Sequence, residues 1–180
     1  MGMDSKSQAL MDLISQNRPS VVFLRETKID NLDDFRHLSR TLQGLGFDHS
    51  KEVLSDGRFG GLGLFWKEGI KMCIRPSSHR FIDAELKGDP GDPIWKLTGF
   101  YGHPTMNLRY LSWQAIKELS DEDLLPWVIV GDFNEILHAD EKKDGSRRSE
   151  SQMRGFRDVV GYTDLVDLGY IGSRFTWSNR

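Results

Sequence analysis

The stretch Trp127-Val128-Ile129-Val130-Gly131-Asp132-Phe133-Asn134 joins a short apolar run to a Gly-Asp-Phe-Asn turn. Because the run is continuous and mostly β-branched, it predicts a strand that is buried on both faces. Gly131 allows a sharp turn where the strand ends. Asp132 and Asn134 are then expected near the carboxyl end of the strand, which is the edge where open α/β sheets usually bind ligands. Taken alone, these two residues fit a helix cap or a turn better than a binding site.

A second strand with the same design occurs near the start of the chain. Residues 20–24 form a short apolar run, and Arg25-Glu26-Thr27-Lys28 follows it at once. Two parallel strands of this kind would bring Glu26 and Asp132 to the same edge of one sheet, which is the first indication of a site. Glu26 alone also fits an exposed residue in a turn.

The remaining pattern mixes helices with many short strands. Apolar spacing predicts helices over residues 7–14, 31–42, 109–119 and 152–160, with Asn31 as a cap. Strands are predicted over residues 60–66, 70–74, 80–86, 94–101, 163–170 and 174–179. Antiparallel strands at this density, flanked by helices, indicate an α+β fold in layers rather than a doubly wound sheet.

Three glycines, Gly60, Gly61 and Gly63, stand at the start of one predicted strand. They resemble a phosphate-binding loop, but such loops bind through the amides of a following helix and no helix is predicted here. Close packing of a strand explains these glycines better.

Composition limits the classes of function. The chain has 180 residues, enough for one domain with a core, and its net charge of −3 disfavours non-specific binding of nucleic acid over the whole surface. Cys73 is the single cysteine, so no intrachain disulfide or cysteine-based zinc cluster forms, which fits a reducing compartment such as the nucleus or cytoplasm. No apolar run approaches the roughly 18 residues of a membrane span.

The densest basic stretch contains Lys142, Lys143, Arg147 and Arg148. These side chains are suited to contact phosphates. Acidic residues are interleaved with them, however, so a solvated loop explains the stretch at least as well.

Four segments occur in a characteristic order: residues 24–28 (LRETK), 99–104 (GFYGHP), 131–134 (GDFN) and 175–179 (FTWSN). Together they resemble the endonuclease/exonuclease/phosphatase family, and in particular the endonuclease domain of plant LINE-type (non-LTR) retrotransposon polyproteins. The resemblance runs from about residue 7 to residue 180. It implies a DNase I-like, four-layer α/β/β/α sandwich that cleaves phosphodiester bonds in DNA with Mg²⁺, or with Mn²⁺ in its place.

The resemblance also implies roles for individual residues. Glu26 would be the carboxylate that binds the metal, because Mg²⁺ prefers hard oxygen ligands. Asp132 would orient or deprotonate the attacking water, and Asn134 would donate a hydrogen bond to the phosphate. Tyr101 would contact the phosphate or the leaving group.

Two further residues are expected on the substrate side. Thr176 matches a position where related endonucleases approach DNA, and His103 lies beside the predicted end of the strand over residues 94–101. Family members also carry an asparagine on a preceding strand and a final Ser-Asp-His, and neither is found in this sequence. We therefore expect residues 1–180 to form a single partial domain, truncated at both ends and lacking the first strand and the C-terminal segment.

The departures from the family pattern favour one function and leave three others open. The first is a catalytically weak or inactive endonuclease domain of retroelement origin, and the second is an active nuclease. The third is a non-catalytic module that binds nucleic acid or protein, and the fourth is a phosphomonoesterase of the same fold.

Overall fold

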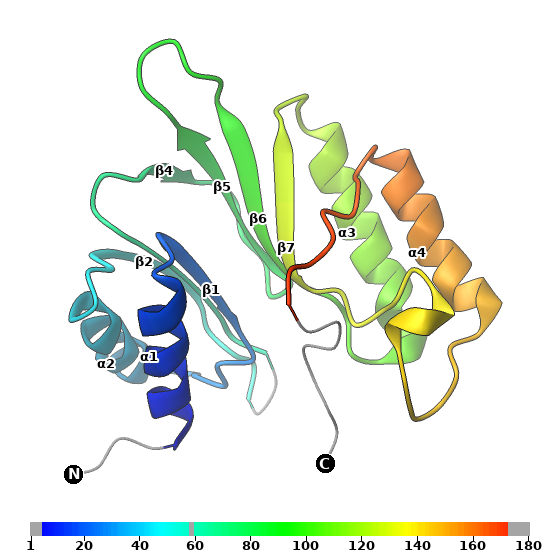
Figure 1. The fold of residues 1–180 in the computed structure, drawn as a ribbon, viewed down its shortest axis with the longest axis horizontal. Coiled ribbons are helices and arrows are strands. Elements are labelled where there is room, and N and C mark those ends of the chain that lie inside the picture. The colour runs from blue at the N-terminus through cyan, green and yellow to red at the C-terminus, as the bar shows by residue number, and fades with distance from the viewer. Residues whose placement is uncertain (1–4, 58–59, 173–180) are drawn as a thin grey trace. The chain divides into compact units, whose positions relative to one another are not determined.

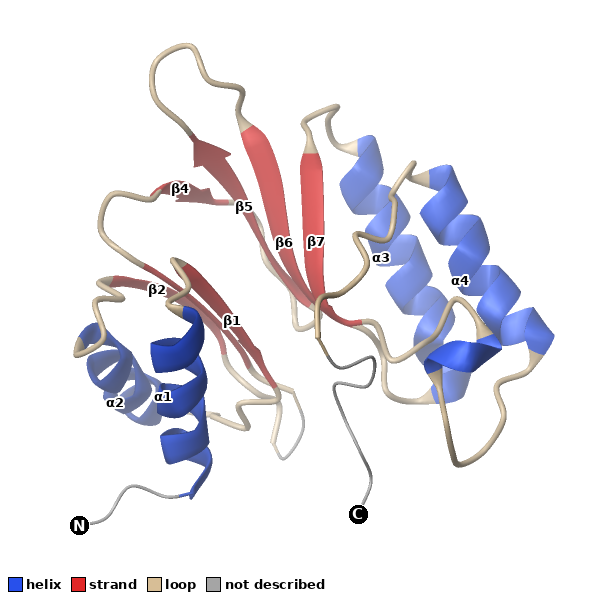
Figure 2. Cartoon of the chain, viewed as in Figure 1, coloured by secondary structure: helices blue, strands red, loops and turns tan. Residues whose placement is uncertain are grey.

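The computed structural model describes residues 5–57 and 60–172 (Figure 1). Over these residues the fold is α+β, as the sequence predicts, with four α-helices and with strands in two sheets (Figure 2). The chain forms two compact units, Met1–Ile94 and Trp95–Arg180, and each unit has its own secondary structure. None of the described helices is both long and apolar enough to cross a membrane.

The first unit contains two helices and five strands: α1 (Ser5–Asn17), β1 (Val21–Arg25), α2 (Leu32–Gln43), β2 (His49–Val53), β3 (Leu62–Trp66), β4 (Lys71–Ile74) and β5 (Phe81–Lys87). The three strands of one sheet follow the order β1-β3-β2, and both pairs are antiparallel. Every residue of β3 is buried because this strand is central. β4 and β5 form a further antiparallel pair.

Both helices of this unit pack on one face of the β1-β3-β2 sheet. Phe35 of α2 stacks on Phe65 of β3 with ring centroids 5.5 Å apart, and Ile14 of α1 joins the same cluster. α2 begins where the sequence predicts, because the Asn31 side chain accepts a hydrogen bond from the Asp34 amide. The apolar stripes on the two helices therefore bury the face of the sheet that they cover.

The second unit consists of β6 (Trp95–Tyr101), η1 (Met106–Leu108), α3 (Arg109–Asp121), β7 (Trp127–Asp132), η2 (Ala139–Glu141) and α4 (Glu150–Tyr162). β6 and β7 are parallel, and α3 is the helix that connects them. α3 and α4 pack against each other through Trp113 and Phe156, whose ring centroids are 4.6 Å apart.

Three expectations about strands differ from the structure. β7 is only half buried and Val130 is 48% exposed, because among the described residues β7 pairs only with β6. Residues 163–170 form no strand. β1 and β7 belong to different sheets, so the prediction that they are parallel strands of one sheet is wrong. The apolar runs indicated strands correctly, but a run does not specify its pairing partner.

The predicted strand over residues 174–179, and with it Thr176, lies outside the described residues.

Candidate functional site

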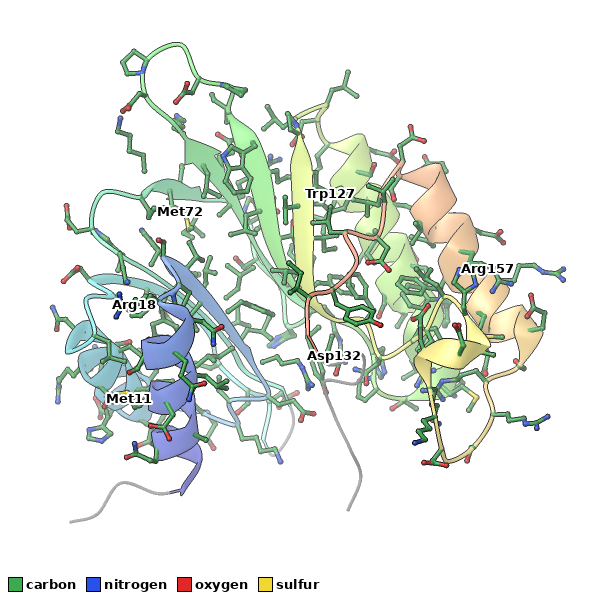
Figure 3. All side chains as sticks on the ribbon, viewed as in Figure 1. Met11, Arg18, Met72, Trp127, Asp132 and Arg157 are labelled. Atoms are coloured by element: carbon green, nitrogen blue, oxygen red, sulfur yellow. The ribbon has the colours of Figure 1, made fainter. Side chains whose placement is uncertain are left out.

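The parallel pair of β6 and β7 brings Tyr101 and Asp132 side by side. The two residues are register partners at the carboxyl ends of their strands, and the Gly102 amide donates to the Asp132 carbonyl at 2.7 Å. Tyr101 is only 3% exposed, whereas Asp132 is partly exposed. Asp132 lies at the opposite end of β7 from Trp127 (Figure 3). Tyr101 and Asp132 thus share one edge, as expected for parallel strands.

Asn134 is fixed in place by two hydrogen bonds. Its backbone amide donates to Asp132 Oδ1 at 2.8 Å, which closes a turn of the kind that Asp side chains favour. Its side-chain Nδ2 donates to the Gly102 carbonyl at 2.8 Å. An amide nitrogen carries two hydrogens, so this side chain can still donate a second hydrogen bond to a ligand.

The backbone around these residues is packed so closely that two glycines are required. A Cβ on Gly102 would lie 2.1 Å from the Phe133 carbonyl oxygen, and one on Gly131 would lie 1.9 Å from the Phe100 carbonyl oxygen. Gly131 also has a φ of +148°, which other residues rarely adopt. The Gly-Asp-Phe-Asn motif therefore folds against the end of β6 because of its glycine.

Phe133 fills the space between the strand end and the helices. Its ring stacks on Phe100 at a centroid distance of 5.5 Å and lies 5.3 Å from the ring of Phe156. These ring contacts link the Gly-Asp-Phe-Asn turn to β6 and to Phe156.

A buried group of charges supports the turn from behind. The Glu135 side chain is 2% exposed and lies 2.8 Å from Arg109 Nη1 and 3.1 Å from Arg148 Nε. Arg109 also donates to the carbonyls of His103 and Pro104 at 3.4 Å, and Arg148 donates to the Asn134 carbonyl at 3.5 Å. The two loops that follow β6 and β7 are thereby linked through one carboxylate.

The sequence did not reveal this network. Glu135 follows Asn134 directly and Arg109 begins a predicted helix, but a single sequence contains no signal that pairs positions 26 residues apart. Arg148 belongs to the basic stretch, and its Nε lies 3.1 Å from Glu135 Oε1.

The other members of the basic stretch have different surroundings. Lys142 donates to the Ser146 carbonyl at 2.7 Å, whereas Lys143 and Arg147 are exposed. Glu141, one of the interleaved acids, accepts from the amides of Leu137 and His138. The stretch is therefore a structured loop with two outward-facing cations.

His103 is held by its own loop. Its amide donates to Ser112 Oγ at 2.7 Å, and its Nδ1 accepts from the Thr105 amide at 3.2 Å. Acceptance at Nδ1 places the proton of the neutral ring on Nε2. Nε2 is thus the atom through which the neutral ring can donate a hydrogen bond.

Glu26 lies in the first unit, directly after β1. Its side chain is 40% exposed, and its Oε2 is 3.9 Å from Arg25 Nη1. Its φ is +51°, a left-handed conformation that is uncommon for a residue with a side chain. Asn134 has a similar φ of +55°, so unusual backbone occurs at two of the predicted site residues.

The structure brings together Tyr101, Asp132 and Asn134, and it places the His103 loop next to them through Arg109. Glu26 belongs to the other unit, and its meeting with Asp132 in one site stays a prediction.

The Glu26 carboxylate is a type of ligand that fits Mg²⁺. Within residues 5–57 and 60–172 no three His, Cys, Asp or Glu side chains cluster as a cage for a metal ion. Mg²⁺ does not require such a cage, because it keeps several waters and usually takes only one or two protein carboxylates. A single accessible carboxylate such as Glu26 can serve as its protein ligand.

Residues 1–180 match the model of the Endonuclease/Exonuclease/phosphatase family over their whole length. The chain belongs to this family. Membership confirms the family that the four ordered segments indicated. A search of the curated proteins found no match.

Solved structures show the same fold. The chain is similar to an AP endonuclease from Leishmania major, with a TM-score of 0.64, 17% identity and coverage of 87% of this chain and 61% of that one. It is also similar to a humanized TDP2 from D. rerio, with a TM-score of 0.56, 15% identity and coverage of 91% and 65%. ANGEL2, a 2′,3′-cyclic phosphatase, matches with a TM-score of 0.53, 16% identity and coverage of 73% and 44%. The chain thus spans less than two thirds of the length of each of these proteins.

Proposed function

We propose that this chain is the phosphodiesterase portion of a metal-dependent endonuclease that cleaves DNA. The observation that carries the proposal is the arrangement of Asp132 and Asn134, which hydrogen bonds lock at the carboxyl end of β7 within a chain that matches the family throughout. A carboxylate and an amide fixed side by side are suited to a water nucleophile and a phosphate oxygen, respectively.

Asp132 would receive the proton of the attacking water, or orient that water toward phosphorus. Its Oδ1 already accepts from the Asn134 amide, which fixes the carboxylate plane. Asn134 would donate the second hydrogen of Nδ2 to a non-bridging phosphate oxygen. The other hydrogen of Nδ2 is bound to the Gly102 carbonyl, which fixes the orientation of the amide. The amide therefore does not have to reorient when negative charge develops on the phosphate.

Tyr101 and His103 would contact the phosphate on the side of β6. Tyr101 is the register partner of Asp132, so its backbone is fixed beside the carboxylate. His103 would donate from Nε2, since its Nδ1 is occupied by the Thr105 amide. Thr176 would contact the DNA, as the family resemblance implies.

Glu26 would hold Mg²⁺ or Mn²⁺ through its carboxylate. The metal would supply Lewis-acid stabilisation of the negative charge on the phosphate. Glu26 serves this role because its side chain is accessible and follows a fixed strand.

DNA is the proposed substrate, and a plant LINE-type retroelement is the proposed origin. Both rest on the resemblance of the sequences of residues 130–137 (VGDFNEIL) and 175–179 (FTWSN) to that branch of the family. A phosphomonoesterase is the competing function, on grounds of fold alone.

The test is nicking of supercoiled plasmid by the full chain with Mg²⁺. We expect Glu26→Gln and Asp132→Asn each to lower the rate by about 100-fold or more, since each removes a group that acts on the reacting atoms. Asp158→Asn, an exposed acid on α4, is the matched control and should leave the rate unchanged.

Three outcomes contradict the proposal. Nicking that persists in both site variants would show that other residues carry the reaction. Hydrolysis of a phosphate monoester without nicking would favour the phosphomonoesterase. A wild-type chain that binds DNA in a salt-sensitive way but cleaves nothing would favour a non-catalytic binding module.

A further inference from the structure

The backbone that carries Glu26 is strained in two places. Glu26 has a φ of +51° and Lys28 a φ of +56°, so two of three consecutive residues with side chains adopt the left-handed conformation. Such a conformation is unfavourable for these residues and persists only where the surrounding structure imposes it. Contacts with other parts of the first unit must therefore impose the left-handed conformation of Glu26 and Lys28.

The turn over residues 26–28 is bound to the segment that precedes β3. The Thr27 amide donates to the Gly61 carbonyl and the Lys28 amide to the Gly60 carbonyl, each at 3.1 Å. On the other side of the turn, the Ser55 amide donates to the Ile29 carbonyl at 2.8 Å. Three backbone hydrogen bonds thus hold a turn that has no regular secondary structure of its own.

These bonds also change the register of the sheet. Within the β1–β3 pair, Arg25 lies opposite Leu62, so an unbroken ladder would place Gly60 opposite Thr27. Instead, Gly61 accepts the bond from Thr27. One extra residue is therefore accommodated on the β1 side after Arg25, as in a β-bulge, and bulges redirect side chains next to functional sites.

Gly61 is the residue that lets the turn approach so closely. A Cβ at this position would lie 2.4 Å from Thr27 Oγ1, 3.2 Å from the Lys28 amide nitrogen and 3.3 Å from Ser55 Cβ. The Thr27 hydroxyl can rotate away, but the Lys28 nitrogen belongs to the backbone and can move only with the turn. Any side chain at position 61 would thus push against the backbone that carries Glu26.

We propose that Gly61 is a positioning residue for the metal-binding carboxylate of Glu26: it holds the bulged turn over residues 26–28 in its left-handed conformation by close backbone packing. The inference rests on the proposed function in assigning a metal to Glu26. It gives Gly61 a role that is distinct from phosphate binding, since this glycine acts on the turn and not on the substrate.

Gly60 offers a matched control within the same segment. Its φ is +81° and that of Gly61 is +82°, so an alanine at either position must adopt a similar left-handed φ. No atom lies within 4 Å of a Cβ built on Gly60, whereas a Cβ on Gly61 meets the turn. A comparison of Gly61→Ala with Gly60→Ala therefore isolates the contact with the turn.

The experiment measures two properties of the full chain. The first is hydrogen exchange at the Thr27 and Lys28 amides, and the second is Mn²⁺ binding followed by electron paramagnetic resonance. We expect Gly61→Ala to accelerate exchange at both amides and to weaken Mn²⁺ binding by about tenfold or more, the range found when groups that orient a metal ligand are altered. Gly60→Ala should change both properties much less than Gly61→Ala does.

A second variant covers the case in which Gly61→Ala folds poorly. Thr27→Ala removes the hydroxyl nearest to the added Cβ, so Gly61→Ala/Thr27→Ala should recover part of the Mn²⁺ affinity. Thr27→Ala alone should bind Mn²⁺ like the wild type. Recovery of this kind would not follow from a general loss of stability.

The outcomes separate the two proposals. Equal behaviour of Gly61→Ala and Gly60→Ala in both measurements overturns the positioning role, even if the wild type nicks DNA. Mn²⁺ binding that depends on Gly61 in a chain that does not nick DNA overturns the proposed hydrolysis alone. A wild type without any Mn²⁺ binding overturns the metal role of Glu26 and the positioning role with it.

Discussion

Asn134 Nδ2 donates a 2.8 Å hydrogen bond to the Gly102 carbonyl, and so a side chain of one turn fastens the turn that ends the neighbouring strand. Because β6 and β7 are parallel, both turns lie at the same edge of the unit. The Asn134 side-chain amide, which would bind phosphate, therefore also helps to hold the two turns together.

This dual role of Asn134 predicts different results for two substitutions. Asn134→Gly and Asn134→Ala both remove the side-chain bond, but only alanine pays the steric cost of a φ near +55°. We expect Asn134→Ala to lower the free energy of unfolding by about 1 kcal/mol more than Asn134→Gly does. Urea denaturation measures the difference. Equal stabilities would show that the left-handed conformation is not maintained at this position.

The close approach of the two turns predicts that Gly102 cannot be enlarged. A Cβ there would overlap the Phe133 carbonyl oxygen at 2.1 Å, so Gly102→Ala should lower the free energy of unfolding by roughly 1–3 kcal/mol and displace Asn134. Gly155→Ala is the control, because this glycine lies inside α4 and a Cβ would have only an ordinary contact with Trp113 Nε1 at 3.9 Å. That variant should gain about 0.5–1 kcal/mol. The same sign for both substitutions in thermal unfolding would contradict the packing described.

Glu135 is expected to be the most sensitive charged residue of the second unit. Glu135→Ala would leave Arg109 and Arg148 facing each other without a carboxylate, although their side chains are only 8% and 22% exposed. Removing one partner of a buried ion network costs on the order of 3 kcal/mol. Chemical denaturation checks the loss, and Glu118→Ala, an exposed acid on α3, should change stability by less than about 0.5 kcal/mol. A loss at Glu135 no larger than that at Glu118 would mean that the network adds nothing to stability.

The hydrogen bond between Tyr162 and Asp121 leads us to expect a lower free energy of unfolding at high pH. Its hydroxyl donates to both carboxylate oxygens of Asp121, at 3.0 and 3.1 Å. This hydrogen bond, the negative charge of Asp121 and partial desolvation raise the pKa of Tyr162 above its ordinary value of 10.0. The unfolded chain therefore releases the proton first, so the stabilisation is complete below pH 10.0 and is lost as the pH rises through the folded-state pKa.

The check is the pH dependence of unfolding for the wild type and Tyr162→Phe. Phenylalanine has no proton to lose, so the stability difference between the two proteins should shrink above pH 10.0. A constant difference across this range would show that the hydroxyl does not pair with Asp121 in solution.

Local patterns in the sequence predicted much of the fold. The helix over residues 31–42 was placed correctly because Asn31 is a strong cap and the apolar spacing matches the helical period. The Gly-Asp-Phe-Asn turn at the end of β7 was also predicted, since glycine and short polar side chains specify turns through their own backbone preferences.

Pairing between distant segments was not predictable in the same way. The apolar runs that became β1 and β7 look alike, yet one joins the sheet of β2 and β3 and the other pairs with β6. An apolar strand can pair with any neighbouring strand that helps to bury it. Only the packing of the complete unit therefore selects one pairing partner.

The sequence by itself determined the family, most of the helices and strands, and the identity of the residues proposed to act on phosphate. The helices and strands follow from residue types and from spacing over a few positions, whereas the family and the proposed site residues follow from the resemblance of the four ordered segments. Only the tertiary structure decided that Glu135 is enclosed by two arginines, that Asn134 is fastened to Gly102, and that Gly61 packs against the turn of Glu26. These contacts join residues far apart in the chain, and their geometry arises from the packing of whole strands and helices, which the order of residues does not display.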